Sequence, residues 1–273
     1  MQNDPKQYNL PLLLDNVVQI VGKVASMIQK VPFSVMQKSE AANIVTSNDI
    51  VSQRQLIKEL GSLLPNSGFY CEEEDVCDRN KEYVWIIDPI DGTTNYSRGI
   101  NDCAISVALL KNQTVILGVV YSIFSNDVYS AILGGGAFLN GKQISVSANT
   151  FENSILCTAM SLYEKKHAKV CSDIIYDTYM QCNDVRRFGS CALELCYLAC
   201  GKCDLYFEIR VFPWDCAAGS LVLREAGGTI CALANKELSL SGPSVVVAAN
   251  TAENYTKLSL IVNKYLQTTP YEE

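Results

Sequence analysis

Histidine is almost absent from this 273-residue sequence, which contains a single one, His167. Histidine-rich zinc and iron sites need several imidazoles, and Ser-His-Asp or Cys-His catalytic groups need one at their centre. His167 instead follows two lysines inside a predicted helix, which favours a solvated surface position. The sequence therefore argues against chemistry that depends on imidazole.

Charged residues and long apolar runs are also scarce. Charged residues make up 19% of the chain and apolar residues 48%, a balance that supplies a substantial core and is not typical of disorder. The net charge of −7 argues against a nucleic-acid backbone or an anionic membrane surface as the main partner. No apolar run approaches 18 residues, and residues 1–5 lack the basic and apolar order of a signal peptide. We therefore expect a cytoplasmic protein that binds neither nucleic acid nor membrane.

Disulfides are not expected, although twelve cysteines are present. Their density is below that of small secreted domains stabilised by disulfides, and most stand among apolar neighbours, as Cys103 and Cys231 do. Cys200 and Cys203 have zinc-knuckle spacing, but no second pair lies at a suitable distance. Reduced thiols packed in the core are the preferred interpretation.

The first half of the chain predicts two helices followed by antiparallel strands. Apolar residues recur at helical spacing over the first 30 residues and again over residues 49–64. Residues 83–87 are almost wholly apolar, which is typical of a strand covered on both faces. Short β-rich runs between turn residues predict a meander with strands at residues 105–110, 115–121, 128–133 and 144–146. The three glycines at 134–136 lie between strands, so we do not interpret them as a phosphate-binding loop.

The second half alternates strands and helices, which predicts an α/β lobe. Strands are expected at residues 155–159, 185–188, 205–207, 229–232 and 245–249, and helices at residues 165–179, 190–199, 215–226 and 252–265. The polar residues 147–150 mark the expected boundary between an N-terminal lobe, residues 1–150, and a C-terminal lobe, residues 151–273.

Carboxylates gather in two early segments. Glu72, Glu73 and Glu74 form a run that is, by itself, typical of a solvated loop. Asp88 and Asp91 follow the predicted buried strand, where turn hydrogen bonding or a helix cap would also account for them.

Considered together, these acidic residues predict a metal and phosphate site. Pro89 is expected to force a turn after the strand. The two aspartates and the Ile90 carbonyl then converge on one point. Oxygen ligands without histidine or thiolate suit a hard cation, Mg²⁺ before Zn²⁺. Backbone N–H groups beginning at Gly92 would face the same point, where a helix N-terminus suits a phosphate.

A further acidic pair, Glu208 and Asp215, lies far along the chain. Asp215 stands at the start of a predicted helix, where the helix dipole stabilises an acid. A capping role for Asp215 is therefore an alternative to metal binding.

These segments resemble the inositol monophosphatase family, Mg²⁺-dependent and lithium-sensitive phosphomonoesterases related to fructose-1,6-bisphosphatase. Three separated motifs carry the resemblance: Glu72-Glu73, Asp88-Pro89-Ile90-Asp91-Gly92-Thr93-Thr94-Asn95, and Trp214-Asp215-Cys216-Ala217-Ala218-Gly219. Further matches are Lys38 with Val45-Thr46-Ser47-Asn48-Asp49, then Arg187-Phe188-Gly189-Ser190-Cys191-Ala192, and Arg224-Glu225-Ala226-Gly227-Gly228. The resemblance implies a layered α-β-α-β-α sandwich, a homodimer, and an active site in the cleft between the two parts of the chain.

The resemblance also implies the metal ligands. Glu72, Asp88 and the Ile90 carbonyl would hold a first Mg²⁺. Asp88, Asp91 and Asp215 would hold a second, and a weaker third ion would lie near Glu72.

The resemblance further implies how water and substrate are held. Asp49 and Thr93 would orient and deprotonate the attacking water, while Glu72 and its metal would lower the pKa of that water. Gly92 and Thr93 would bind phosphate oxygens. The alcohol part of the substrate would contact Asp91, Cys191 through its backbone, Glu208 and Asp215.

Three departures from the family pattern bear on the substrate. Cys71 stands where the family often has glycine, Cys191 where it has alanine, and Asn43 where it often has aspartate. Residues 209–213 and those near Ser161 also line the substrate side in the family. Inositol monophosphate is the first expectation, and the alternatives are fructose-1,6-bisphosphate, histidinol phosphate and a nucleotide 3′-phosphate.

Two other classes of protein were weighed against this interpretation. Haloacid-dehalogenase phosphatases need two aspartates that are two residues apart, whereas Asp88 and Asp91 are three apart. A non-catalytic binding protein on the same fold would be expected to have lost a carboxylate or the activating threonine. All of these residues are present: Asp49, Glu72, Asp88, Asp91, Thr93 and Asp215.

Overall fold

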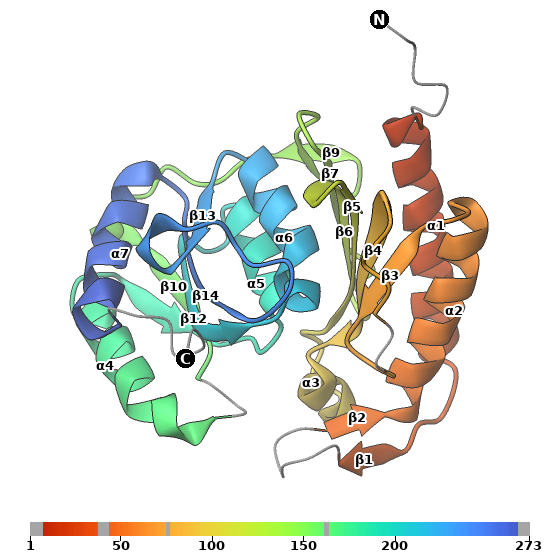
Figure 1. Ribbon diagram of the computed structural model, residues 1–273. Coiled ribbons are helices and arrows are strands. Elements are labelled where there is room, and N and C mark those ends of the chain that lie inside the picture. The colour runs from red at the N-terminus through yellow and green to blue at the C-terminus, as the bar shows by residue number, and fades with distance from the viewer. Residues whose placement is uncertain (1–7, 38–43, 75–76, 161–163, 267–273) are drawn as a thin grey trace, which may run out of the picture.

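The computed structural model describes residues 8–37, 44–74, 77–160 and 164–266, and it has five layers (Figure 1). Helices α1 (Leu10–Ile28) and α2 (Ser47–Leu63) cover one face of a seven-stranded sheet. Helices α5 (Cys191–Ala199) and α6 (Pro213–Glu225) fill the space between this sheet and a five-stranded sheet. Helices α4 (Ala168–Tyr179) and α7 (Ala252–Tyr265) cover the far side. This is the α-β-α-β-α sandwich that the sequence led us to expect.

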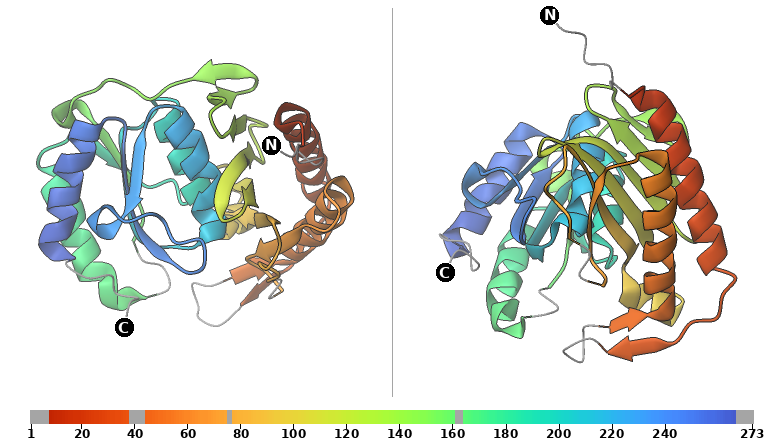
Figure 2. Two further views of the ribbon diagram at one scale, coloured as in Figure 1. Left: turned by 45° about the horizontal axis from the view of Figure 1, so that its top comes forward. Right: turned by 45° about the vertical axis from the view of Figure 1, so that its right-hand side comes forward.

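Helix α1 buries one apolar stripe and exposes the other face. Leu13, Val17, Val21 and Val24 are buried against β6 and α2, and the Asn9 side chain caps the helix by accepting the Leu12 N–H. Figure 2 shows α1 and α2 side by side across the outer face of the large sheet. With 19 residues and a mean hydropathy of 1.3, α1 is long and apolar enough to cross a membrane. Polar residues such as Asp15 and Lys23 interrupt its apolar run, and a helix with one buried face in a folded core passes the same test.

Helix α2 begins with reciprocal capping, because the Thr46 side chain and backbone exchange hydrogen bonds with Asp49. This fixes Asp49 in the first turn with its side chain fully buried. Leu56 and Leu60 anchor the rest of the helix in the core shared with α1. Asp49 is therefore held in place by the helix start itself.

The seven-stranded sheet has the order β3-β4-β5-β6-β7-β8-β9 and confirms the antiparallel meander. Its strands are β3 (Gly68–Cys71), β4 (Tyr83–Asp91), β5 (Ala104–Lys111), β6 (Thr114–Ser122), β7 (Val128–Ile132), β8 (Ala137–Leu139) and β9 (Lys142–Ile144). Strand β3 pairs parallel to β4, and a separate hairpin joins β1 (Val35–Gln37) to β2 (Ile44–Thr46).

The end of the meander differs from the prediction. A strand was expected at residues 144–146, but the structure has β8 and β9 joined by a tight turn at Asn140 and Gly141. Both residues have positive φ, 52° and 75°, as such two-residue hairpin turns require. The turn fixes the pairing of β8 with β9, so the last strand lies earlier in the sequence than predicted.

The five-stranded sheet has the order β11-β10-β12-β14-β13 and is mixed. Its strands are β10 (Ile155–Thr158), β11 (Asp184–Arg186), β12 (Leu205–Val211), β13 (Thr229–Ala232) and β14 (Ser244–Ala249). Strand β10 is parallel to both neighbours, whereas β14 is antiparallel to both of its own. The proposed boundary at residue 150 falls in the connection between the sheets, while α6 contacts strands of both. The division into two lobes stays a proposal.

Close packing of α6 on the large sheet determines where its N-terminus lies. A Cβ atom on Gly118 of β6 would be 2.8 Å from the Ala218 carbonyl oxygen, so only glycine permits this approach. Ser106 of β5 donates a hydrogen bond to the Trp214 carbonyl, with 3.1 Å between oxygen atoms. Ser106 is also the partner of Asp88 in the sheet register. The start of α6 is thereby held beside Asp88.

Two further expectations have clear outcomes. All twelve cysteines are free thiols, as expected. His167 was expected to be solvated, but its side chain is only 13% exposed and its Nε2 atom lies 3.1 Å from Glu164 Oε2. The two lysines before His167 suggested an exposed segment, whereas Glu164 contacts the His167 side chain.

Candidate active site

Asp88 and Asp91 face the same side of the sheet because β4 is irregular between them. Residues three apart in a regular strand point to opposite faces. The pairing of β4 with β5 shifts register between Asp88 and Asp91, and Pro89 lies in this irregular stretch. The expected turn after residue 87 was therefore wrong, since the strand continues to Asp91. The bulge achieves the convergence that a turn was expected to produce.

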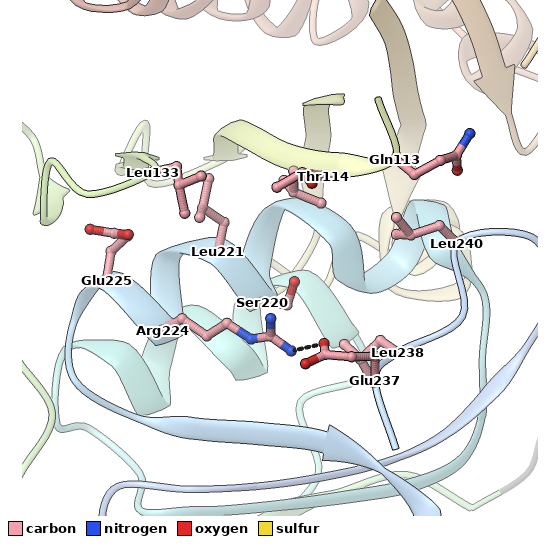
Figure 3. Close-up of a pocket in the computed structure, with 11 residues that line it drawn as sticks. Gln113, Thr114, Leu133, Ser220, Leu221, Arg224, Glu225, Glu237, Leu238 and Leu240 are labelled. Carbon is pink, nitrogen blue, oxygen red and sulfur yellow. Dashed lines mark hydrogen bonds and ion pairs between the residues drawn. The ribbon is translucent and has the colours of Figure 1, made fainter. Parts of the chain in front are cut away.

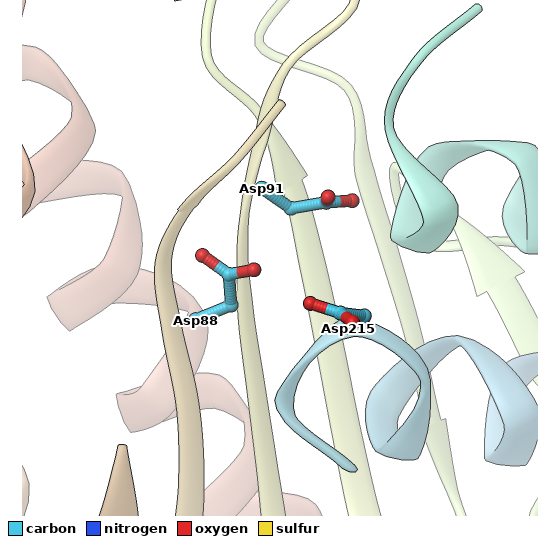
Figure 4. A group of neighbouring side chains, drawn as sticks. All are labelled: Asp88, Asp91 and Asp215. Carbon is cyan, nitrogen blue, oxygen red and sulfur yellow. The ribbon is translucent and has the colours of Figure 1, made fainter. Parts of the chain in front are cut away.

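Three carboxylates form the centre of the site. One oxygen each from Asp88, Asp91 and Asp215 can be chosen so that all lie within 4.8 Å of one another. Figure 4 shows the three side chains pointing toward a common space between β4 and the start of α6. Asp215 also caps α6, because one of its oxygens accepts the Phe212 N–H at 2.7 Å. Helix capping and metal binding by Asp215 are therefore compatible.

The three glutamates after β3 separate into different environments. Glu72 follows β3, its N–H bonds to the Ile87 carbonyl, and its charge helps to raise the pKa of Asp88 and Asp215. Glu73 is buried, and its backbone N–H donates to Gln53 Oε1. Glu74 pairs with Arg54 at the surface. The solvated-loop interpretation therefore holds for Glu74 but not for its two neighbours.

The electrostatics of the cluster fit a divalent cation. Burial, followed by repulsion between neighbouring carboxylates, raises the pKa of Asp88 and Asp215 well above the ordinary value and that of Asp91 to about 6. Within the described ranges, no lysine or arginine forms an ion pair with any of the three. Closely spaced oxygen ligands without a protein cation suit a hard ion such as Mg²⁺.

Asp49 and Thr93 lie in direct contact although they are 44 residues apart. The Thr93 hydroxyl is 3.0 Å from Asp49 Oδ1 and 3.0 Å from the Ile90 carbonyl oxygen, so its single proton can bond to only one of them at a time. The other Asp49 oxygen accepts the Thr46 N–H at 2.8 Å. Burial raises the pKa of Asp49 to about 6. A hydroxyl that donates to Asp49 keeps lone pairs that can accept a bond from water.

The turn after β4 requires glycine. Gly92 has φ of +87°, and a Cβ atom there would lie 3.0 Å from the Asp102 carbonyl and 3.2 Å from the Gly189 carbonyl. Helix α3 (Thr93–Arg98) begins immediately afterwards. The Gly92 conformation thus directs the chain from the carboxylate cluster into α3.

The start of α5 forms the opposite wall. Asp91 Oδ2 accepts bonds from Ser190 Oγ at 2.6 Å and from the Ala192 N–H at 2.7 Å, and the Cys191 N–H also bonds to Asp91. Cys191 and Glu208 line a small pocket, about 70 Å³, that is continuous with Asp91 and Asp215. Burial raises the pKa of Glu208 to about 7. Of the candidate residues named from the sequence, Asp91, Cys191, Glu208 and Asp215 therefore border one pocket.

A profile of the inositol monophosphatase family matches residues 13–267. The chain belongs to this family. Nus factor SuhB of Xylella fastidiosa is 37% identical over 198 residues, which cover 72% of this chain and 71% of that protein. The structure of the suppressor protein SuhB from Bartonella henselae has a TM-score of 0.85 at 28% identity, covering 93% of this chain and all of that one. An inositol monophosphatase of Thermotoga maritima has a TM-score of 0.83 at 30% identity, covering 93% and 98% of the two chains.

Several residues at this site of the family fold were missed by sequence reasoning. Ser190 caps α5 and bonds to Asp91, which the Phe-Gly-Ser sequence before a helix could have indicated. Glu194 is buried and accepts the N–H groups of Phe188 and Gly189 at 2.7 and 2.9 Å. Arg210 lines the pocket, within the segment 209–213 that the resemblance placed on the substrate side without naming this residue. Lys38, Asn43 and Ser161, singled out from the sequence, lie outside the described residues.

Proposed function

We propose that this protein is a Mg²⁺-dependent phosphomonoesterase acting on a small polyol phosphate, with inositol monophosphate as the first candidate. The observation that carries the proposal is the convergence of the Asp88, Asp91 and Asp215 carboxylates, the first two of them buried, with no protein cation paired to them in the described ranges. Membership of the inositol monophosphatase family supports the same chemistry.

The residues around the cluster suit two or three metal ions. Glu72, Asp88 and the Ile90 carbonyl would hold the first, Asp88, Asp91 and Asp215 the second, and a third would lie near Glu72. When bound, such ions neutralise phosphate charge and lower the pKa of a bound water.

Thr93 is proposed to orient the attacking water. Its hydroxyl accepts a bond from the water while donating its own proton to Asp49, which the 3.0 Å contact between these two side chains supports. Asp49 then serves as the final proton acceptor. The backbone at Gly92 and Thr93 would bind phosphate oxygens.

The wall formed by α5 and β12 is proposed to position the alcohol. Glu208 would accept hydrogen bonds from substrate hydroxyls, and Asp91 and Asp215 would contact the ester side. The Cys191 N–H, proposed from the resemblance as a substrate donor, lowers the pKa of Asp91 in this structure. We therefore assign it first to holding Asp91 in position.

Phosphate release tests the proposal. Purified protein should hydrolyse a phosphomonoester with Mg²⁺, lose that activity with a chelator, and be inhibited by Ca²⁺, whose looser coordination misplaces the water. Inositol 1-phosphate, fructose-1,6-bisphosphate, histidinol phosphate and adenosine 3′,5′-bisphosphate form the substrate panel. Full activity in excess chelator would refute the metal mechanism.

A binding role is the second candidate, because several relatives carry the name Nus factor SuhB. The complete set of carboxylates with Thr93 favours catalysis as the primary role. We keep the proposals of a cytoplasmic homodimer and, from the net charge of −7, of no direct nucleic-acid contact. Sedimentation tests the homodimer, and an RNA-binding titration tests the absence of nucleic-acid contact.

A further inference from the structure

Two arginines line the pocket that also contains two residues of the carboxylate cluster. The pocket is bordered by Asp91 and Asp215, and also by Glu208, Arg187 and Arg210. Substrate phosphate is proposed to lie at the two aspartates, so the alcohol part extends toward the arginines. The part of the substrate beyond Glu208 therefore meets positive charge.

Arg210 is held in a defined position on β12. Its Nη1 atom is 3.3 Å from Glu164 Oε1, and its guanidinium lies over the Phe212 ring, 5.0 Å from the ring centroid. Phe212 in turn stacks on Trp214 with centroids 4.8 Å apart and ring planes 4° from parallel. Trp214 immediately precedes Asp215. The stack therefore fixes the Arg210 charge relative to the carboxylate cluster.

Both arginines of the pocket have acidic neighbours. Glu164 is shared, because Lys166 Nζ lies 2.9 Å and His167 Nε2 lies 3.1 Å from the same carboxylate that Arg210 approaches. Arg187 is exposed, and its charge acts against the burial that raises the pKa of Glu208. Two permanent cations, Arg187 and Arg210, thus line a pocket whose acidic residues are Asp91, Glu194, Glu208 and Asp215.

We propose that Arg210, assisted by Arg187, forms a subsite for a second anionic group on the alcohol part of the substrate. A guanidinium binds a phosphate or carboxylate through paired N–H donors, and Arg210 is already oriented by its aromatic neighbour. The proposal rests on the proposed phosphatase function and narrows it. The preferred substrate carries, besides the phosphate to be cleaved, a further phosphate or a carboxylate.

Steady-state kinetics with three substrates tests this subsite. Fructose-1,6-bisphosphate supplies a second phosphate, 6-phosphogluconate supplies a carboxylate, and inositol 1-phosphate supplies neither. The wild type should favour at least one of the first two over inositol 1-phosphate in kcat/KM by about tenfold or more. The better of the two identifies the second group.

Variants of Arg210 separate recognition from packing. Arg210→Gln should lower kcat/KM for the substrate with the second anionic group by about 10–100-fold, mainly through KM, and change inositol 1-phosphate turnover less than about threefold. Arg210→Lys keeps the charge without the planar donor pair and should recover part of the loss. Arg186→Gln is the matched control, because Arg186 is the exposed neighbour of Arg187, pairs with Asp184, and does not line the pocket.

Binding of the three substrates, measured in Ca²⁺, distinguishes the subsite proposal from the phosphatase proposal. If the wild type hydrolyses none of the substrates but binds fructose-1,6-bisphosphate through Arg210, the subsite stands and the phosphatase proposal fails. If hydrolysis occurs and Arg210→Gln affects all three substrates equally, the phosphatase stands and the subsite is refuted. Equal affinity of wild type and Arg210→Gln for every ligand would also refute the subsite.

Discussion

The two ends of α6 hold carboxylates in opposite electrostatic situations. At the N-terminal end, Asp215 is crowded by Asp88 and Asp91, and within the described ranges no lysine or arginine pairs with them. At the C-terminal end, Glu225 accepts the N–H groups of Gly134 and Gly136 at 2.7 and 2.8 Å. The first group of charges has no ion-pair partner within the described ranges, whereas Glu225 is satisfied by hydrogen bonds within the chain.

The surroundings of the two ends differ in the same way. Near Glu225 the chain encloses a hollow of about 390 Å³, largely apolar, in which Arg224 and Glu237 pair at 2.9 Å (Figure 3). Arg224 and Glu237 neutralise each other there, and both carboxylate oxygens of Glu225 accept backbone N–H groups. The comparison teaches that an acidic cluster has functional meaning where its charges are left uncompensated, rather than where acids are merely close together.

Thr93→Ala is the change with the largest expected effect, and it sharpens the comparison because every cleft carboxylate stays in place. Loss of the hydroxyl that orients the water should lower kcat by about 10²–10⁴-fold. Mg²⁺ affinity should stay within about twofold, since the metal ligands are intact. Thr94→Ala, at the exposed neighbouring threonine, is the matched control.

A double variant tests whether Thr93 acts together with Asp49. Asp49→Asn should give a loss similar to that of Thr93→Ala. The double variant should be scarcely slower than either single one, because residues that act as a unit are not additive. Multiplication of the two losses would assign Asp49 a separate role, such as holding the start of α2.

Asp215→Asn attacks the N-terminal end of α6 directly. Removing one anionic ligand should cost about 3–4 kcal/mol in the activation barrier, or roughly 10²–10³-fold in kcat. The asparagine oxygen can still accept the Phe212 N–H, so the melting temperature should change little. A nearly normal rate would show that Asp215 is only a helix cap.

Much of this arrangement was predictable because it is local in sequence. Helical periodicity located α1 and α2, and alternation of short apolar runs located most strands. The aspartates were recognised from a contiguous motif. The bulge at Pro89 was not predictable, because it depends on how β4 pairs with β5.

Contacts between distant segments account for the rest. The resemblance paired Thr93 with Asp49, but nothing in their local patterns does so. Arg210 and Glu164 lie 46 residues apart in segments that carry no motif for each other. The Arg210–Glu164 pair arises from how these two segments pack together, so only the structure reveals it.

Glu194→Gln tests a buried acid outside the proposed metal ligands. Burial raises the pKa of Glu194 to about 8 from its usual 4.5. Between these pH values the unfolded chain has lost a proton that the folded protein retains, so the wild-type free energy of unfolding falls as pH rises. Glutamine keeps an acceptor for the Phe188 and Gly189 N–H groups and cannot ionise. Urea unfolding at pH 5 and 8.5 should show the variant gaining up to roughly 4 kcal/mol relative to wild type; equal pH dependence would contradict this account.

Glu225→Gln has the smallest expected effect and tests the C-terminal end of α6. The two Gly N–H donors each bind one carboxylate oxygen, and glutamine offers only one acceptor oxygen. The free energy of unfolding should fall by about 1 kcal/mol, while kcat and Mg²⁺ affinity stay unchanged. A large loss of activity would show that the two ends of the helix are coupled.

Mg²⁺-dependent stability is the most direct test of the claim that the cleft carboxylates need an external cation. Denaturant unfolding of chelator-treated protein would be measured with and without Mg²⁺, for wild type, Glu225→Gln and the Asp88→Asn/Asp215→Asn double variant. At a free Mg²⁺ concentration about 100 times its dissociation constant, wild type and Glu225→Gln should each gain about 2.7 kcal/mol. The double variant should gain almost nothing. Equal Mg²⁺ stabilisation of all three proteins, or none in the wild type, would contradict the account.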